Sequence, residues 1–165
     1  MTIGYFLMHT HRITDTNVDV KMLGLYRSEK DALDAIPRYL DRAGFSSAPD
    51  GFFVDRHVVG ERRFASGFIH GQPVEPDGDV VTDSPGSVLG SEGFLLIHDY
   101  EMPEEVDNER LVGLFATKAD REKAKAQALI LPGFSSFPDA FSGVTMEVGK
   151  DYWEEGYVTL TPEEM

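Results

Sequence analysis

Nearly the same heptapeptide occurs twice in this 165-residue chain, 89 residues apart. Residues 44–50 read Gly-Phe-Ser-Ser-Ala-Pro-Asp, and residues 133–139 read Gly-Phe-Ser-Ser-Phe-Pro-Asp. At this offset residues 4–69 align with residues 93–158 without a gap, and 18 of the 66 positions are identical. A gapless match of this length indicates an internal duplication. We therefore predict two similar lobes related by a pseudo-twofold axis.

The duplication divides the chain into four predicted parts. These are a first repeat lobe at 1–69, an acidic linker rich in proline and glycine at 70–92, a second repeat lobe at 93–160 and a tail at 161–165. Lobes of about 65 residues are small for independent stability, so we expect them to pack on each other.

Each copy predicts the order strand-strand-helix-strand-short strand. The strands are expected at 4–11, 21–26, 52–59 and 67–69 in the first copy, and at 93–98, 110–116, 141–148 and 156–160 in the second. Ser28 is a good helix N-cap with Asp31 three residues later, Pro37 is expected to kink or shorten the helix, and Gly44 is expected to close it. In the second copy the helix is predicted to begin at Thr117 and to end before Pro132. The predicted fold is α+β, with helices packed on antiparallel or mixed sheets.

The formal net charge of −14 and the absence of cysteine limit the possible functions. Without cysteine there are no disulfides and no thiolate nucleophiles. A strongly negative field repels nucleic acid phosphates and anionic membranes and favours encounter with a basic protein. No apolar run approaches the roughly 20 residues of a membrane span. The first residues indicate a strand and not a signal peptide, which predicts a cytoplasmic protein.

The second copy carries several motifs in a fixed order. They are His98 at a strand end, Arg-Leu-Val-Gly-Leu-Phe at 110–115, Leu-Pro-Gly-Phe at 131–134, Pro-Asp-Ala-Phe at 138–141 and Asp-Tyr-Trp-Glu-Glu-Gly-Tyr-Val at 151–158. This pattern resembles a family of small bacterial domains of unknown function. The resemblance covers most of the second copy, and the first copy departs from it at residues 62–67. It implies the domain boundaries and a bacterial origin, and it implies no activity, metal or cofactor.

The repeated His9 and His98 are the main titratable candidates, because both end the first strand of their copies. A histidine at a strand end most often bonds a nearby carbonyl or carboxylate and has a structural role. The alternative is a small-molecule or enzyme site between the lobes that uses both imidazoles. No nucleophile elbow, phosphate-binding loop or metal-ligand spacing supports catalysis, so we predict no catalytic residues, no metal and no cofactor.

Carboxylates are densest between the first two predicted strands of the second copy. With the acidic closing motif they form a candidate surface for a protein partner: Asp99, Glu101, Glu104, Glu105, Asp107, Glu109, Asp151, Trp153, Glu154 and Glu155. An exposed aromatic ring surrounded by carboxylates is a typical anchor for a basic partner. Two alternatives are a solvated acidic loop and, because Trp153 aligns with Phe64, a core position for the indole ring.

The sequence therefore favours a non-enzymatic, acidic bacterial binding protein. Its most concrete form is an immunity protein that neutralises a basic secreted toxin by covering the toxin's active site. The site between the lobes near His9 and His98 remains the alternative, and a structural subunit that assembles through sheet edges is a third hypothesis. The oligomeric state is not predicted.

Overall fold

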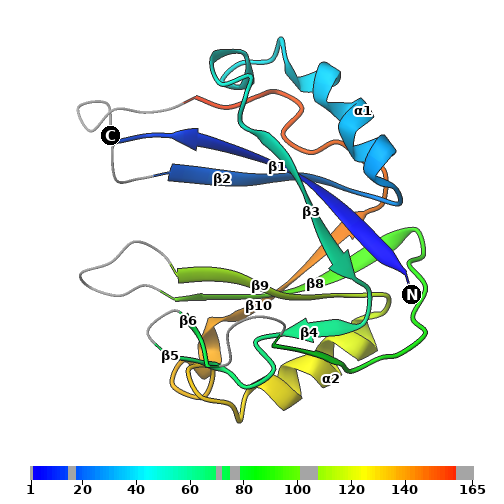
Figure 1. Ribbon diagram of the computed structural model, residues 1–165, viewed down its shortest axis with the longest axis vertical. Helices are drawn as coiled ribbons and strands as arrows, with labels where there is room; N and C mark the ends of the chain where they lie inside the picture. Colours follow the sequence, from blue (N-terminus) through cyan, green and yellow to red (C-terminus); the bar gives the residue numbers. More distant parts are fainter. Residues whose placement is uncertain (1, 15–17, 70–71, 75–78, 101–107, 159–165) are drawn as a thin grey trace. The chain divides into compact units, whose positions relative to one another are not determined.

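The structure, a computed structural model, describes residues 2–14, 18–69, 72–74, 79–100 and 108–158. Figure 1 traces the elements along the chain, which divides into two compact units. Unit 1 consists of Met1–Ile3 and His57–Glu147, and unit 2 consists of Gly4–Arg56 and Val148–Met165. Each unit therefore contains segments from both copies of the repeat.

Unit 2 is built around a three-stranded sheet in the order β2-β1-β3. Its elements are β1 (Ile3–Arg12), β2 (Val18–Tyr26), α1 (Glu29–Tyr39), the 3₁₀ helix η1 (Phe45–Ser47) and β3 (Phe52–Val58). Strands β1 and β2 pair antiparallel, with Tyr5 opposite Tyr26 and Arg12 opposite Val18, and the register shifts once between Leu7 and Met8.

Helix α1 begins where the sequence predicts. Ser28 is the N-cap, and its hydroxyl accepts the N–H of Asp31 at 3.0 Å. The residues that face the sheet are small except for Tyr39, which is fully buried. The helix continues through Pro37 and ends at Tyr39, so the prediction that Gly44 closes it is wrong.

Gly44 instead lies one turn further on, directly before η1, with φ of 83°. A Cβ atom there would lie 2.6 Å from the carbonyl oxygen of Tyr157. Glycine is therefore required by the close approach of a distant segment and by its left-handed backbone, and not by the helix end.

Unit 1 contains a five-stranded sheet in the order β10-β8-β9-β4-β7 and a separate small hairpin, β5-β6. Its elements are β4 (Glu61–Arg63), β5 (Phe68–Ile69), β6 (Gln72–Pro73), β7 (Val80–Thr82), β8 (Glu92–Tyr100), β9 (Asn108–Phe115), α2 (Lys118–Ala128), η2 (Pro138–Ala140) and β10 (Phe141–Glu147). The strand pairings within this sheet are antiparallel. The predicted α+β class is confirmed, and the pseudo-twofold relation of the lobes stays a prediction.

Helix α2 is capped in the same way as α1, but the face that it buries is less apolar. The hydroxyl of Thr117 accepts the N–H of Asp120 at 3.0 Å, as the sequence predicts. Its buried residues are two alanines and Arg121. The Arg121 guanidinium lies 5.8 Å from the ring centre of Phe94, so its cation faces an aromatic ring of the adjacent strand.

Each unit has an aromatic-rich core between its helix and its sheet. The buried residues in unit 2 are Leu7, Leu23, Tyr26, Ala32, Ala35, Tyr39 and Phe45. Those in unit 1 are Phe68, Leu96, Tyr100, Val112, Phe115, Ala124, Ala128 and Phe134. Tyr157 packs against the first core, and Phe64 packs against the second.

The ends of the two copies thus pack on the opposite copy. We call residues 57–69 the first closing segment and residues 148–158 the second closing segment. The first belongs to unit 1 with the body of the second copy, and the second belongs to unit 2 with the body of the first copy. The compact units therefore have different boundaries from the two repeat lobes predicted at 1–69 and 93–160.

Positions 89 residues apart have the same local geometry in the two closing segments. Phe64 and Trp153 have φ of 57° and 59°, and they are the non-glycine residues with positive φ in the described chain. The N–H of Phe68 donates to the carbonyl of Pro132 at 2.9 Å, and the N–H of Tyr157 donates to the carbonyl of Ala43 at 2.8 Å. Each closing segment therefore ends on the loop that follows the helix of its unit.

Three strand predictions need correction or cannot be judged. Residues 156–158 are not a strand, because the N–H of Tyr157 bonds a loop carbonyl and not a strand. The predicted linker at 70–92 contributes β6 and β7, and no sequence pattern predicted β4. The sequence Asp-Gly at 77–78 is typical of a small hairpin in the linker, and these two residues lie outside the described part of the chain. Neither α1 nor α2 has the length or the apolar run needed to cross a membrane, within the described part of the chain.

Replacing Gly156 with alanine tests the docking of the second closing segment. Gly156 has φ of 78°, and a Cβ atom would lie 2.2 Å from the carbonyl oxygen of Ala43. We expect Gly156→Ala to lower the free energy of unfolding by about 2 kcal/mol, measured in urea by the fluorescence of the single tryptophan, Trp153.

The control is Gly90→Ala, because no described atom lies within 4 Å of a Cβ there and its φ is not in the left-handed range. This variant should change the free energy of unfolding by less than about 0.5 kcal/mol. Equal losses in the two variants would contradict the close approach at Gly156.

Candidate functional site

The second closing segment lies along β2 and the loop after α1. Its backbone is held by the N–H groups of Gly149, Tyr152 and Tyr157, which donate to the carbonyls of Leu25, Leu23 and Ala43 at 2.7, 2.7 and 2.8 Å. The hydroxyl of the buried Tyr39 also lies 2.7 Å from the carbonyl oxygen of Tyr152. The segment is therefore fixed on unit 2 much as a bound peptide would be.

Asp151 is the main side-chain anchor of this segment. Its carboxylate accepts from Arg38 at two positions, at 2.5 Å from Nε and at 2.8 Å from Nη2. It also accepts the hydroxyl proton of Tyr26. The Asp151 side chain is only 12% exposed, so this predicted surface residue is used inside unit 2.

The electrostatics of this cluster follow from the hydrogen bonds and from burial. The Arg38 guanidinium, assisted by the Tyr26 hydroxyl, lowers the pKa of Asp151 below its ordinary value, although burial acts in the opposite direction. Burial, followed by the adjacent Asp151 carboxylate, raises the pKa of Tyr26 far above its ordinary value. Asp151 is therefore ionised and Tyr26 is a neutral hydrogen-bond donor at neutral pH.

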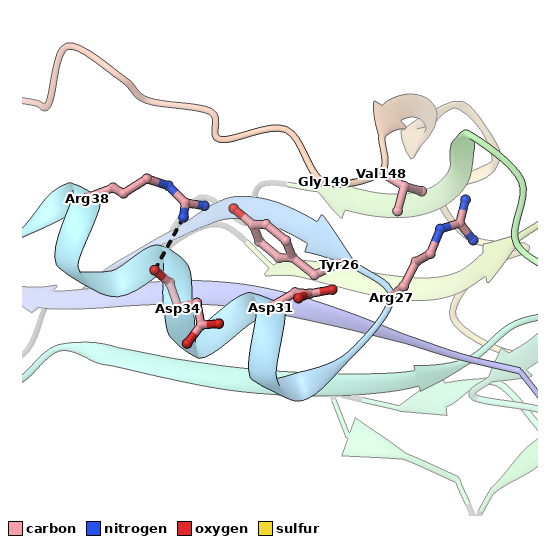
Figure 2. Close-up of a pocket in the computed structure, with 7 residues that line it drawn as sticks. All are labelled: Tyr26, Arg27, Asp31, Asp34, Arg38, Val148 and Gly149. Atoms are coloured by element: carbon pink, nitrogen blue, oxygen red, sulfur yellow. Dashed lines mark hydrogen bonds between the residues drawn. The ribbon is translucent and has the colours of Figure 1, made fainter.

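A cavity of about 380 Å³ opens beside this cluster, within unit 2. It is lined by Tyr26, Arg27, Asp31, Asp34, Arg38, Val148 and Gly149. Figure 2 shows the two aspartates and Arg38 on α1, Arg27 at the opposite end, and Val148 and Gly149 of the second closing segment above them in the view. The Nη1 group of Arg38 donates to the backbone carbonyl of Asp34 at 3.3 Å. The cavity is polar, with charges of both signs on its wall.

Trp153 lies on the surface of unit 2, with 47% of its area exposed. The two residues that follow it, Glu154 and Glu155, are also exposed. The aligned Phe64 is half-buried and packs edge-on against Phe134 at 6.3 Å between ring centres. The expectation of a core position for Trp153, drawn from this alignment, is therefore wrong. Unit 2 offers an exposed ring where unit 1 has a core side chain.

A cation lies against the aromatic side chains of each closing segment. In unit 2 the Nζ atom of Lys21 is 4.1 Å from the ring centre of Tyr157 and 5.0 Å from that of Trp153, and Asp19 pairs with the same amine. In unit 1 the aligned Arg110 is 3.7 Å from the ring centre of Phe68, and burial lowers its pKa. These contacts attach the closing segments to the second strand of each unit.

His9 and His98 are fully buried in equivalent aromatic surroundings. The Nε2 atom of His9 lies 2.9 Å from the carbonyl oxygen of Ala48, and that of His98 lies 3.0 Å from the carbonyl oxygen of Phe137. Because a carbonyl oxygen only accepts, Nε2 carries the proton in each ring. Burial lowers the pKa of both imidazoles, so both are neutral at pH 7. Both histidines thus have the carbonyl bond expected of a structural role.

The acidic run of the second copy is only partly described. Asp99 and Glu109 lie opposite each other on β8 and β9 of unit 1. The predicted site residues Glu101, Glu104, Glu105 and Asp107 lie outside the described residues. The other predicted residues, Asp151, Trp153, Glu154 and Glu155, belong to unit 2. Among the described residues, no three histidine, aspartate or glutamate side chains are grouped in a way that could hold a metal ion.

The chain matches no protein-family model, no curated protein and no solved structure. The resemblance to a family of small bacterial domains therefore stays a prediction.

Sequence reasoning missed the cavity of unit 2 and the role of Arg38. Arg38 and Asp151 are 113 residues apart, and no local spacing connects them. One signal was present: the residue that aligns with Asp151 is Arg62, so the charge reverses at this position between the copies. A reversed charge in an otherwise similar segment indicates different partners in the two units.

Replacing Asp151 with asparagine tests the ion pair with Arg38. We expect Asp151→Asn to lower the free energy of unfolding at pH 7 by about 2 kcal/mol, because it leaves Arg38 without a charged partner. A lowered folded-state pKa gives stability that is present above the ordinary value of 3.8 and is lost as pH falls through the folded-state value. The difference between variant and wild type should therefore shrink below about pH 4. The exposed Asp139→Asn is the control, and a pH-independent difference would contradict the assignment.

The buried His9 predicts a second pH effect on unit 2. Because burial lowers its folded-state pKa from 6.5, the unfolded chain takes up the proton first, and stability falls as pH drops below 6.5. The variant His9→Gln should have a smaller slope of unfolding free energy between pH 6.5 and 5.5, by up to about 1.4 kcal/mol per pH unit. Urea unfolding followed by Trp153 fluorescence measures this slope, and an unchanged slope would exclude the buried neutral imidazole.

Proposed function

We propose that the protein is a non-enzymatic, acidic binding protein of the bacterial cytoplasm whose partner is a basic protein. Its most concrete form is an immunity protein that binds and neutralises a basic secreted toxin. The observation that carries the proposal is the exposed Trp153, which is followed by two exposed carboxylates in a chain of net charge −14.

An indole ring with 47% of its area in solvent leaves apolar surface that a partner can bury. Tryptophan is enriched among the residues that dominate the affinity of protein interfaces. Here the ring has a left-handed backbone, with φ of 59°, in a turn closed by the N–H of Gly156 on the carbonyl of Trp153 at 3.0 Å. The ring is therefore presented on a short, fixed turn and not on a long loop.

The charges around the ring favour a basic partner. Glu154 and Glu155 are exposed, whereas Asp151 is already bound to Arg38. A lysine or arginine of the partner would meet the two glutamates, and a guanidinium could stack on the indole. We assign the partner surface of unit 2 to Trp153, Glu154 and Glu155, and we assign Asp151 to holding the turn.

We also propose that the chain arose by tandem duplication and that its lobes are related by a pseudo-twofold axis. The support is the agreement of positions 89 residues apart in helix caps, in buried histidines and in the hydrogen bonds of the closing segments. In this account the duplicated units have diverged in function, because only the second closing segment carries the exposed tryptophan and the glutamates.

Affinity capture from lysate of the source organism tests the partner. The bait is the full chain, compared with Trp153→Ala and with the double variant Glu154→Gln, Glu155→Gln. We expect a basic protein that high salt releases and that neither variant retains. The charge-matched control is the double variant Asp50→Asn, Asp139→Asn, which changes two exposed carboxylates elsewhere and should retain the partner. Capture that is equal for all four baits would contradict the proposal.

A further inference from the structure

Unit 1 binds a segment of its own linker against the start of its closing segment. Strand β7 pairs antiparallel with β4, from Glu61 opposite Thr82 to Arg63 opposite Val80. The chain then turns over Gly60, whose carbonyl oxygen accepts the N–H groups of Asp83 and Ser84 at 3.0 and 3.1 Å. A Cβ atom on Gly60 would lie 2.3 Å from the carbonyl oxygen of Ser84, so the linker segment covers this glycine closely.

Charged side chains of unit 1 fix the same linker segment. The Nε group of Arg62 donates to the carboxylate of Asp83 at 2.7 Å, and both side chains are less than 10% exposed. The Nζ group of Lys123, on α2, donates to the backbone carbonyl of Asp83 at 3.0 Å. Arg62 therefore pairs with the aspartate side chain, and Lys123 holds the backbone at the same residue.

Of the three aligned positions in unit 2, Gly149 and Asp34 line the cavity described above, and Asp151 is bound to Arg38 beside it. The unit 1 residues that align with the lining of this cavity are Val59, Gly60, Phe115, Ala116, Asp120, Lys123 and Gln127. Two of them, Gly60 and Lys123, bind the linker segment. Gly149 aligns with Gly60 and also has a left-handed backbone, with φ of 85°. No described atom lies within 4 Å of a Cβ on Gly149. Within the described part of the chain, no strand of unit 2 takes the place that β7 has in unit 1.

We infer that unit 2 binds an extended, basic segment of a partner protein along residues 149–152, in the way that unit 1 binds residues 80–84. The bound segment would add as a strand beside Lys150–Tyr152, which align with β4, and would turn over Gly149. The inference rests on the proposed binding function and specifies the part of the partner that is recognised.

The charge expected of the bound segment follows from two positions at which the side-chain charge is reversed between the units. Asp34 of unit 2 aligns with Lys123, and Asp151 aligns with Arg62. Unit 1 places Arg62 on the Asp83 carboxylate and Lys123 on its backbone carbonyl, whereas unit 2 has a carboxylate at each of these two positions. A lysine or arginine of the partner would meet Asp34 and the adjacent Asp31 on the wall of the cavity, where Arg38 is already paired with Asp151.

The carboxylates differ in how readily they bind a new cation. Asp151 is held by Arg38 and Tyr26 and is only 12% exposed. Asp34 pairs only with the amine of Lys30 among the described side chains, and the Lys30 side chain is 81% exposed, so a partner cation can displace it at little cost. Asp34 is thus the residue on which the preference for a basic segment depends.

Two synthetic peptides test the inference on the full chain. Both copy residues 80–87, Val-Val-Thr-Asp-Ser-Pro-Gly-Ser, and one carries Asp83→Lys. In ¹⁵N-labelled protein we expect the lysine peptide to shift the amide signals of Gly149, Asp34 and Asp151, with an affinity at least tenfold higher than that of the aspartate peptide. No binding, binding elsewhere or equal affinities would overturn the inference.

The variant Asp34→Lys restores the charge that unit 1 has at this position. It should reverse the preference, so that the aspartate peptide binds better than the lysine peptide. Asp50→Lys makes the same charge change at an exposed residue outside the cavity and should leave the preference unchanged. If Asp34→Lys and Asp50→Lys have equal effects, the charge recognition assigned to Asp34 is wrong.

These results separate the inference from the proposed function. Peptide binding does not depend on Trp153, so the variant Trp153→Ala should lose the captured partner and keep the lysine peptide. A captured basic partner that Asp34→Lys still retains would overturn the inference alone. Binding of the lysine peptide without any captured partner would overturn the proposed partner alone.

Discussion

Each closing segment packs on the body of the opposite copy, and this packing determines how both compact units are built. Two glycines allow it in unit 2, because Gly44 and Gly156 lie where any Cβ atom would meet backbone of the neighbouring segment. The hydrogen bond from Tyr157 to Ala43 and the pair of Asp151 with Arg38 then fix the second closing segment in place. The exposed Trp153 and the cavity beside Gly149 both exist because this segment is held there.

Much of the local structure could be predicted from the sequence, because it depends on neighbouring residues. Ser28 and Thr117 cap their helices as expected, and the alternating apolar residues before them form the paired strands. For His9 and His98 the sequence favoured a bond to a nearby carbonyl or carboxylate, and both bond a carbonyl. These features follow from short-range spacing and from the gapless alignment.

The exchange of the closing segments could not be predicted, because the repeat makes the choice degenerate. A ring at position 157 can pack beside Phe45 or beside its equivalent Phe134, and both loops offer a carbonyl to its N–H. For the same reason, the cluster of Asp151 with Arg38 and Tyr26 could not be predicted. The sequence predicts which groups each closing segment can bond. It does not predict which of the two similar loops, the one after α1 or the one after α2, the segment packs on.

The second closing segment therefore belongs to unit 2. Nuclear Overhauser effects from the ring of Tyr157 test this assignment most directly, because this ring lies 4.9 Å from that of Phe45 and 5.9 Å from that of His9, centre to centre. The account predicts cross-peaks from Tyr157 to Phe45 and His9. Cross-peaks to Phe134 and His98 in their place would show that each copy closes on itself, and would contradict the account.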